Sequence, residues 1–167
     1  MFNALLEFNA RVLQDSQAVL GMLSDDEYCY CPGKHHEGTI GQHMRHIADH
    51  YRALEKIENG VLSYQSRRRN TLIESVVHVA IAEFSEIERI LTVLQPGPIA
   101  VIAEVNFLGG ASVSVDSSIA RELAFVASHA VHHHAMIAVL LHALGKQPPA
   151  NLGVAPATLG WRSQLAG

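Results

Sequence analysis

The sequence predicts an all-α fold: a four-helix bundle with a short β-hairpin before the last helix and an irregular C-terminal tail. Four segments of roughly 20–25 residues repeat apolar side chains at helical spacing, which is the number and length of helices that such a bundle needs. Capping residues, Gly or Pro bound these segments. The 167 residues suit a single domain, 1–167, because domains commonly hold roughly 100–200 residues.

Two helices are expected in the first part of the chain. Residues 2–23 place Leu and Val at helical spacing and predict the first helix. Residues 24–38 contain Pro, Gly and Asp and predict a loop. Thr39 and Gln42 have the spacing of a capping box, so a second helix is expected from about residue 40 to the Asn59-Gly60 pair.

The second part of the chain alternates helices with turn-forming segments. Residues 60–70 are polar and basic and predict a connection, followed by a third helix over about 72–94. Within 99–116 the apolar period changes around a Gly-Gly turn, which favours a short β-hairpin. A fourth helix is expected over about 119–144, and the Pro-containing tail, 146–167, is expected to be irregular.

Composition excludes several classes of protein. Hydrophobic residues make up 49% of the chain and charged residues 17%, which argues against a disordered protein. The formal net charge of -4 gives no general attraction to nucleic acid or anionic lipid, so neither is an expected partner. No apolar run approaches the roughly 18 residues of a membrane span, and the N-terminus does not have the pattern of a signal peptide. The expected location is therefore cytoplasmic.

Histidine is the unusual residue type in this sequence. The chain has eleven histidines, and seven of them fall within 43–50 and 129–134. In the fourth helix, His129 and His133 are four residues apart on its apolar side, so both imidazoles can reach one metal ion. His132 and His134 are expected at the solvent-exposed flanks of this helix.

The second helix offers three candidates for a third ligand. His43, His46 and His50 lie on one side of the helix at spacings of three and four residues. Periodicity places His43 and His50 nearer the buried centre and His46 at its edge. A site between two helices uses edge positions, so this reasoning leaves all three open.

Two segments together resemble a known family. TIGQHMRHIADHY, followed much later by SHAVHHHAMIAVLLHALG, is similar to the DinB/YfiT-like superfamily of metal-dependent four-helix-bundle proteins. The resemblance covers roughly residues 1–145. It implies that His46, His129 and His133 are metal ligands. Their position beside these residues leaves His43, His50 and His132 as alternative ligands or as residues that support them. The additional histidines, the hairpin and the tail are departures from the family pattern.

The resemblance also implies chemistry and partners. It implies a divalent metal ion, zinc first, with nickel or iron as alternatives, and a homodimer. The expected function is a metal-dependent enzyme that acts on a small molecule, with transfer of a low-molecular-weight thiol or a thiol-dependent isomerisation as reaction types. Three imidazoles leave coordination positions open for water or substrate, as in catalytic metal sites.

The sequence also contains further candidate residues and allows an alternative function. Asp49, like His43 and His50, could move a proton or orient a ligand, but an ordinary polar role on the helix surface or in the core is the preferred interpretation. The basic stretch Arg67–Asn70 could bind an anionic substrate. The alternative function is a non-catalytic stress-response or protein-binding helical module, in which a metal is structural or absent.

Overall fold

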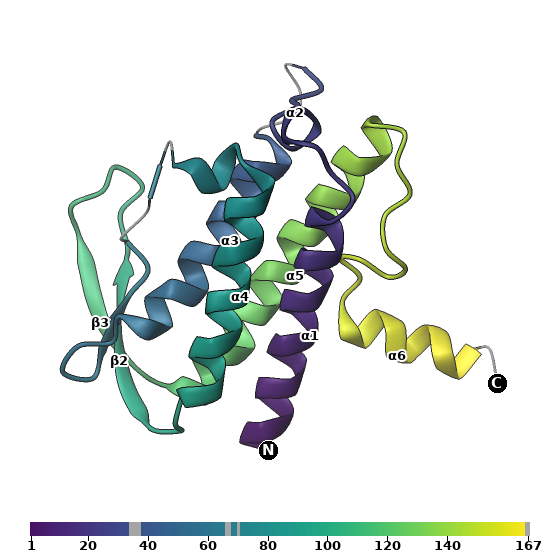
Figure 1. Cartoon of the computed structure of the whole chain (residues 1–167). Helices are drawn as coiled ribbons and strands as arrows, with labels where there is room; N and C mark the ends of the chain where they lie inside the picture. The colour runs from purple at the N-terminus through teal and green to yellow at the C-terminus, as the bar shows by residue number, and fades with distance from the viewer. Residues whose placement is uncertain (34–37, 66–67, 70, 166–167) are drawn as a thin grey trace.

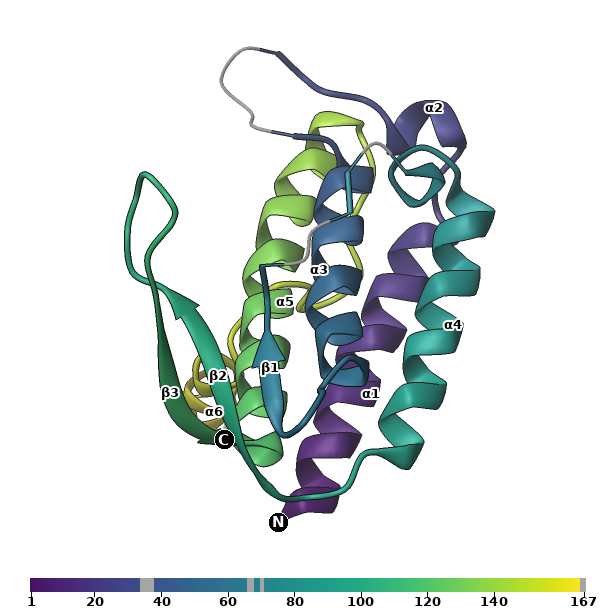
Figure 2. The same cartoon turned by 90° about the vertical axis from the view of Figure 1, so that its left-hand side faces the viewer.

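The computed structural model describes residues 1–33, 38–65, 68–69 and 71–165. Arg67 and Asn70, two members of the basic stretch, lie outside the described residues. Helices make up about 59% of the described part, and a three-stranded mixed sheet accompanies them. The prediction of an all-α four-helix bundle is therefore wrong as a fold class. The fold is a mixture of helices and β-sheet, because the polar connection and the hairpin join into one sheet that covers part of the helical layer (Figure 2).

Four long helices lie side by side. They are α1 (Phe2–Leu20), α3 (Ile40–Glu55), α4 (Val77–Val93) and α5 (Ile119–Ala143). Each of α1 and α3 contacts both α4 and α5, and Figure 1 shows all four running along one another. The core forms where their apolar faces meet. Large fully buried side chains in these helices are Leu13, Leu20, Met44, Ile47, Tyr51, Phe84, Ile87, Leu123 and Ile137.

The sheet has strand order β1-β2-β3. β2 (Pro98–Glu104) and β3 (Ser112–Ser118) form the expected antiparallel hairpin, in which Val101 pairs with Val115. β1 (Val61–Ser63) pairs in parallel with β2, with Leu62 opposite Val101. This strand lies in the segment predicted to be a plain connection. Its three residues are too few to show a period, so only the pairing with β2 reveals it.

The third predicted helix is two elements. η1 (Leu72–Glu74) is a short 3₁₀ turn, and α4 begins only at Val77. The backbone N–H of Val77 donates to Oδ1 of Asp25 at 2.8 Å, so a carboxylate from a distant segment caps α4. Asp25 opens α2 (Asp25–Tyr28), a one-turn helix in the predicted loop, with a capping box of Ser24 and Glu27.

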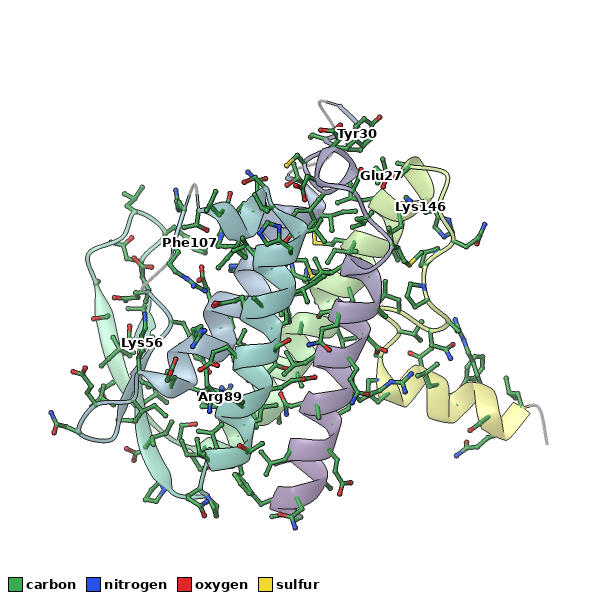
Figure 3. All side chains as sticks on the ribbon, viewed as in Figure 1. Glu27, Tyr30, Lys56, Arg89, Phe107 and Lys146 are labelled. Atoms are coloured by element: carbon green, nitrogen blue, oxygen red, sulfur yellow. The ribbon has the colours of Figure 1, made fainter. Side chains whose placement is uncertain are left out.

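The tail is partly helical, contrary to expectation. α6 (Pro156–Leu165) extends from the body and buries none of its residues. The segment before it crosses α5, and a Cβ on Gly153 would overlap the backbone of Ala135. At the start of the tail, Lys146 Nζ lies 3.0 Å from Oε1 of Glu27 and donates to the Met22 carbonyl oxygen at 2.8 Å (Figure 3). The tail is therefore attached to the body at its beginning and at Gly153.

α5 is long and apolar. One 18-residue window in it has a mean hydropathy of 1.4, so α5 has the length and composition of a membrane span. This finding differs from the expectation that no segment of the sequence has them. Within the fold, 44% of that window is buried, and α5 packs against both α1 and α3. Its apolar character thus agrees with its place as a core helix.

Candidate metal centre

The candidate centre lies between α3 and α5. The predicted capping box begins α3: Gln42 N–H donates to Thr39 Oγ1, and Thr39 N–H donates to Gln42 Oε1, both at 3.1 Å. This start fixes the rotation of α3, so that His43 and His46 in its first two turns face α5. α5 carries His129 and His133 one turn apart on the side facing α3.

Three imidazoles converge at this contact. His46, His129 and His133 each offer a ring nitrogen, and these atoms lie within 4.8 Å of one another. Nε2 of His129 is 3.0 Å from Nε2 of His46 and 3.2 Å from Nε2 of His133. A tetrahedral metal ion with metal–nitrogen distances of about 2.0–2.1 Å separates its nitrogen ligands by about 3.3 Å. The spacing of these nitrogens therefore fits a shared ion.

Hydrogen bonding alone does not explain this geometry. In the plane of the ring, each imidazole nitrogen has one position, which holds either a hydrogen or a lone pair. His129 Nε2 faces two nitrogens at hydrogen-bonding distance, so it cannot form a full hydrogen bond with both. A cation among the three nitrogens would use all three lone pairs at once. The donor set thus fits a divalent metal ion, with nitrogen ligands of the type that zinc, nickel and iron accept.

His43 and His50 lie around the three imidazoles. Nδ1 of His43 is 3.0 Å from Nδ1 of His133, so one of these nitrogens donates a hydrogen bond and the other accepts it, which orients the two rings. Nδ1 of His50 donates to the backbone oxygen of His46 at 2.9 Å. The His50 ring centroid is 4.1 Å from that of His129. Of the three candidates on α3, His46 is the one grouped with His129 and His133, and the other two support the cluster.

The two remaining histidines of α5 have different environments. His132 is exposed, as expected, and its ring contacts that of His133 at a centroid distance of 5.4 Å. His134 is only 1% exposed, so its expected place at a solvent-exposed flank is wrong. Its Nε2 is 2.7 Å from Oγ of Ser16 on α1, and the tail covers its backbone at Gly153. His134 is buried by contacts from α1 and from the tail. The sequence near His134 does not reveal these distant contacts.

Burial favours the uncharged form of two histidines in the cluster. Burial is the main cause that lowers the pKa of His133 to about 3, followed by the charges of His129 and the other neighbouring histidines. Burial, and then His132, also lowers the pKa of His43. Neutral imidazole is the form that binds a metal. Burial therefore favours the ligand form of His133 and His43.

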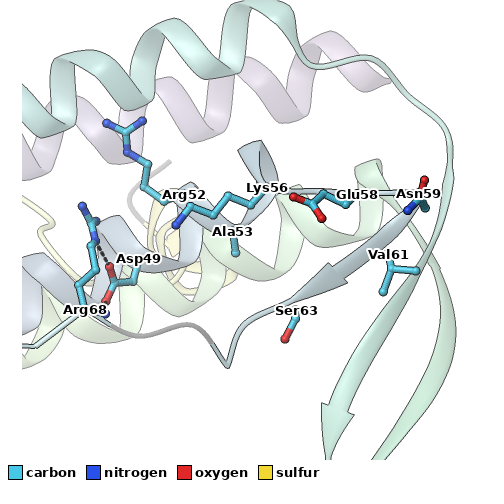
Figure 4. A pocket seen from close by; sticks show the side chains of 9 residues that line it. All are labelled: Asp49, Arg52, Ala53, Lys56, Glu58, Asn59, Val61, Ser63 and Arg68. Carbon is cyan, nitrogen blue, oxygen red and sulfur yellow. Dashed lines mark hydrogen bonds and ion pairs between the residues drawn. The ribbon is translucent and has the colours of Figure 1, made fainter.

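Asp49 belongs to an ion-pair network that is separate from the histidine cluster. Its carboxylate pairs with Arg45 at 3.1 Å and with Arg68 at 2.7 Å, and Arg68 also pairs with Glu83 at 2.9 Å. This ion-pair network borders a cavity of about 460 Å³ formed by α3, β1 and their connection (Figure 4). The lining of that cavity includes none of the clustered histidines. Asp49 therefore has a structural role in an ion-pair network, in agreement with the preferred interpretation.

Two aromatic residues that the sequence did not single out form one side of the cluster. The Phe125 ring is stacked on that of His129, with centroids 5.8 Å apart and an interplanar angle of 20°. Tyr64 is stacked on His50 at 5.2 Å and 24°. Phe125 precedes His129 by one helical turn, so its spacing could have identified it. Tyr64 comes from a segment without periodicity and gave no signal.

Comparison with known proteins adds little to this geometry. No protein-family model matches the chain, and no solved structure matches it. A curated protein, "FK506-binding protein 5" of Rhizopus delemar, is 29% identical over 103 residues. The alignment covers 59% of this chain and 27% of that protein, so this chain matches only about a quarter of its relative. This partial similarity establishes no family for the chain.

Proposed function

We propose that this chain is a divalent-metal-binding protein in which His46, His129 and His133 hold the ion. The observation that carries the proposal is the approach of three ring nitrogens to within 4.8 Å from two different helices. A cation satisfies nitrogens that cannot all be hydrogen-bonded to one another. Zinc is the first choice of metal, because tetrahedral coordination by imidazole suits it, and nickel or iron(II) would also accept these ligands.

We further propose that the metal serves catalysis on a small molecule. Three protein ligands leave at least one coordination position for water or substrate, as in catalytic zinc sites. A bound metal would lower the pKa of a coordinated water or thiol or polarise a carbonyl group. The chain's own residues would orient the ligands: His43 through its contact with His133, and His50 through the backbone of His46. A low-molecular-weight thiol is the substrate class that the sequence resemblance suggests.

Elemental analysis of protein prepared without a histidine tag tests metal binding. We expect about one zinc, nickel or iron ion per chain. His133→Ala should lose the ion, whereas His132→Ala is a matched control that removes the exposed neighbouring imidazole and should retain it. Absence of metal from the wild-type protein, even after incubation with each ion, would refute the proposal. Retention of metal by His133→Ala would refute this ligand assignment.

The response to metal removal distinguishes a catalytic from a structural ion. The apolar core is packed between the helices without help from the histidine cluster. For an open catalytic site, we expect circular dichroism to show nearly unchanged helicity after chelation. Unfolding on chelation would instead favour a non-catalytic module with a structural metal.

A further inference from the structure

A cavity of about 610 Å³ lies beside the candidate metal centre. This volume is within the range of small-molecule sites, about 300–1,000 Å³. β2 forms one wall, the first turns of α5 form another, and Tyr64, Gln65 and Arg69 lie on a third side. The lining residues that matter below are Tyr64, Arg69, Arg121, Glu122 and Phe125.

The aromatic residues connect this cavity to the histidines. Phe125 lines the cavity and also stacks on His129, and Tyr64 lines it and stacks on His50. The Phe125 and Tyr64 rings lie 5.3 Å apart at a tilt of 58°. One continuous aromatic surface therefore leads from the cavity to a proposed metal ligand.

The buried carboxylate in the cavity wall already accepts three hydrogen bonds from its neighbours. Glu122 is fully buried. Its Oε2 accepts from Tyr64 at 2.7 Å, while its Oε1 accepts from Ser117 at 2.5 Å and from Arg121 at 2.8 Å. The guanidinium of Arg121 also lies over the Phe125 ring, 5.2 Å from its centroid. The positive charge of Arg121 beside Glu122 therefore reduces the repulsion between this carboxylate and an anion in the cavity.

Arg69 has a different status. Within the described part of the chain, it forms no ion pair or hydrogen bond through its side chain, although it lines the cavity. The preceding residue, Arg68, is paired with two carboxylates on the other side of the segment. The lining contains one other carboxylate, that of Glu104 at the end of β2. Among the described residues, no cation lies within ion-pairing distance of it. The cavity therefore contains a guanidinium available for an anion.

We propose that this cavity binds a small carboxylate whose charged end pairs with Arg69 and whose apolar body lies on Phe125 and Tyr64. The other end of the ligand reaches the metal. This inference rests on the proposed function, because it assigns a substrate class to the same centre. Arginine suits a carboxylate because its planar N–H groups match both oxygens.

The helix geometry gives a length scale for the ligand. Arg121, which lines the cavity together with Arg69, and His129, at the histidine cluster, are eight residues apart on α5, or about 12 Å at 1.5 Å per residue. An extended six-carbon chain with a carboxylate at one end and a metal-binding group at the other is about the right size. 6-Mercaptohexanoate has this form, and its uncharged amide, 6-mercaptohexanamide, is the matched control.

The test uses full-length protein loaded with Co²⁺. When the thiol binds, the S–H bond breaks, sulfur keeps the electron pair to bond the metal, and the proton goes to the buffer. Thiolate-to-cobalt absorption then gives the dissociation constant of each probe. We expect wild-type protein to bind the carboxylate about ten-fold more tightly than the amide, as one partly exposed charge-assisted hydrogen-bonded pair would give.

Variants locate the carboxylate. Arg69→Gln should reduce the preference to nearly one, while amide binding stays the same. Arg162→Gln, on the exposed helix α6, should leave the preference at its wild-type value. Equal binding of both probes by wild-type protein, or a preference that survives in Arg69→Gln, would overturn the inference.

A second measurement separates this inference from the metal proposal. Hexanoate and hexanamide lack the thiol, so their binding to metal-free protein can be followed by ligand-observed NMR. A preference for hexanoate that requires Arg69 would support the carboxylate site even if the chain bound no metal. Cobalt and thiol binding without any carboxylate preference would leave the metal centre standing and reject the substrate class.

Discussion

Substitution of Gly41 by Ala tests the close contact that fixes the start of α3. A Cβ on Gly41 would overlap the backbone carbonyl of Glu74 in η1 and would also lie 3.1 Å from the Tyr28 ring. Because the main obstacle is backbone, no side-chain rotation can relieve it, and η1 must move away from α3. Tyr28 donates a buried hydrogen bond to the Ile73 carbonyl oxygen at 2.8 Å, which this movement would weaken.

The expected destabilisation is about 3 kcal/mol. Overpacking costs about 1–3 kcal/mol, and a backbone obstacle places Gly41→Ala at the upper end of that range. The weakened Tyr28 hydrogen bond adds about 1 kcal/mol. The better helix propensity of Ala offsets this with about 1 kcal/mol.

Urea denaturation of the chelated protein measures the effect. With an m-value of about 2 kcal/mol/M, the midpoint should fall by about 1.5 M. Gly160→Ala in α6 is the matched control, since its added Cβ meets nothing within 4 Å and should change stability by less than about 0.5 kcal/mol. A midpoint for Gly41→Ala equal to that of the wild type would refute the close approach of η1 and α3.

Three further predictions concern buried polar groups and the ligands. Burial alone would raise the pKa of Glu83, but hydrogen bonds and ion pairs from two arginines lower it below 4.5, so stability should fall as pH drops from 4.5 through the folded-state pKa. Urea midpoints across this pH range should fall less for Glu83→Gln. Ser16→Ala leaves a buried imidazole nitrogen without its partner and should cost about 1–3 kcal/mol in urea denaturation. In metal-loaded protein, His46→Ala and His129→Ala should be strongly non-additive in thermal stability, because either one removes the shared ion.

The Ser16 and ligand predictions each have a control. Ser85→Ala removes an exposed hydroxyl that also bonds a carbonyl in its own helix, and it should be nearly neutral. Addition of chelator should make the effects of the two ligand substitutions additive. The same loss of stability at acid pH in Glu83→Gln as in the wild type would contradict the role of Glu83. Additivity of the ligand substitutions in the presence of metal would contradict shared ligation.

The sequence predicted features that depend on local spacing. The capping box of Thr39 and Gln42 begins α3 as expected, and the spacing of His129 and His133 brings their rings together. Periodicity could not choose among the histidines of α3, because the choice depends on the angle at which α3 meets α5. The resemblance to a known family supplied His46, which the structure groups with the other two.

Features that depend on distant contacts were missed. β1 exists only through its pairing with β2, and Asp25 caps α4 across 52 positions of sequence. His134 is buried by contacts from α1 and the tail, which its position on the flank of the helix does not predict. The all-α prediction failed for the same reason. From the sequence, the hairpin was expected to be a minor element. In the structure, β1 adds a third strand to it, and the resulting sheet forms one wall of the cavity beside the histidines.

The separation of the proposed ligands along the chain bears on how the protein folds. His46 and His129 are 83 positions apart, with α4 and the hairpin between them. Joining them requires closure of a long loop, and this closure is complete only when α3 has docked on α5. An ion held by both helices would therefore bind after most of the folding barrier has been crossed. It would slow unfolding much more than it accelerates folding, so the metal would act mainly on the lifetime of the native state.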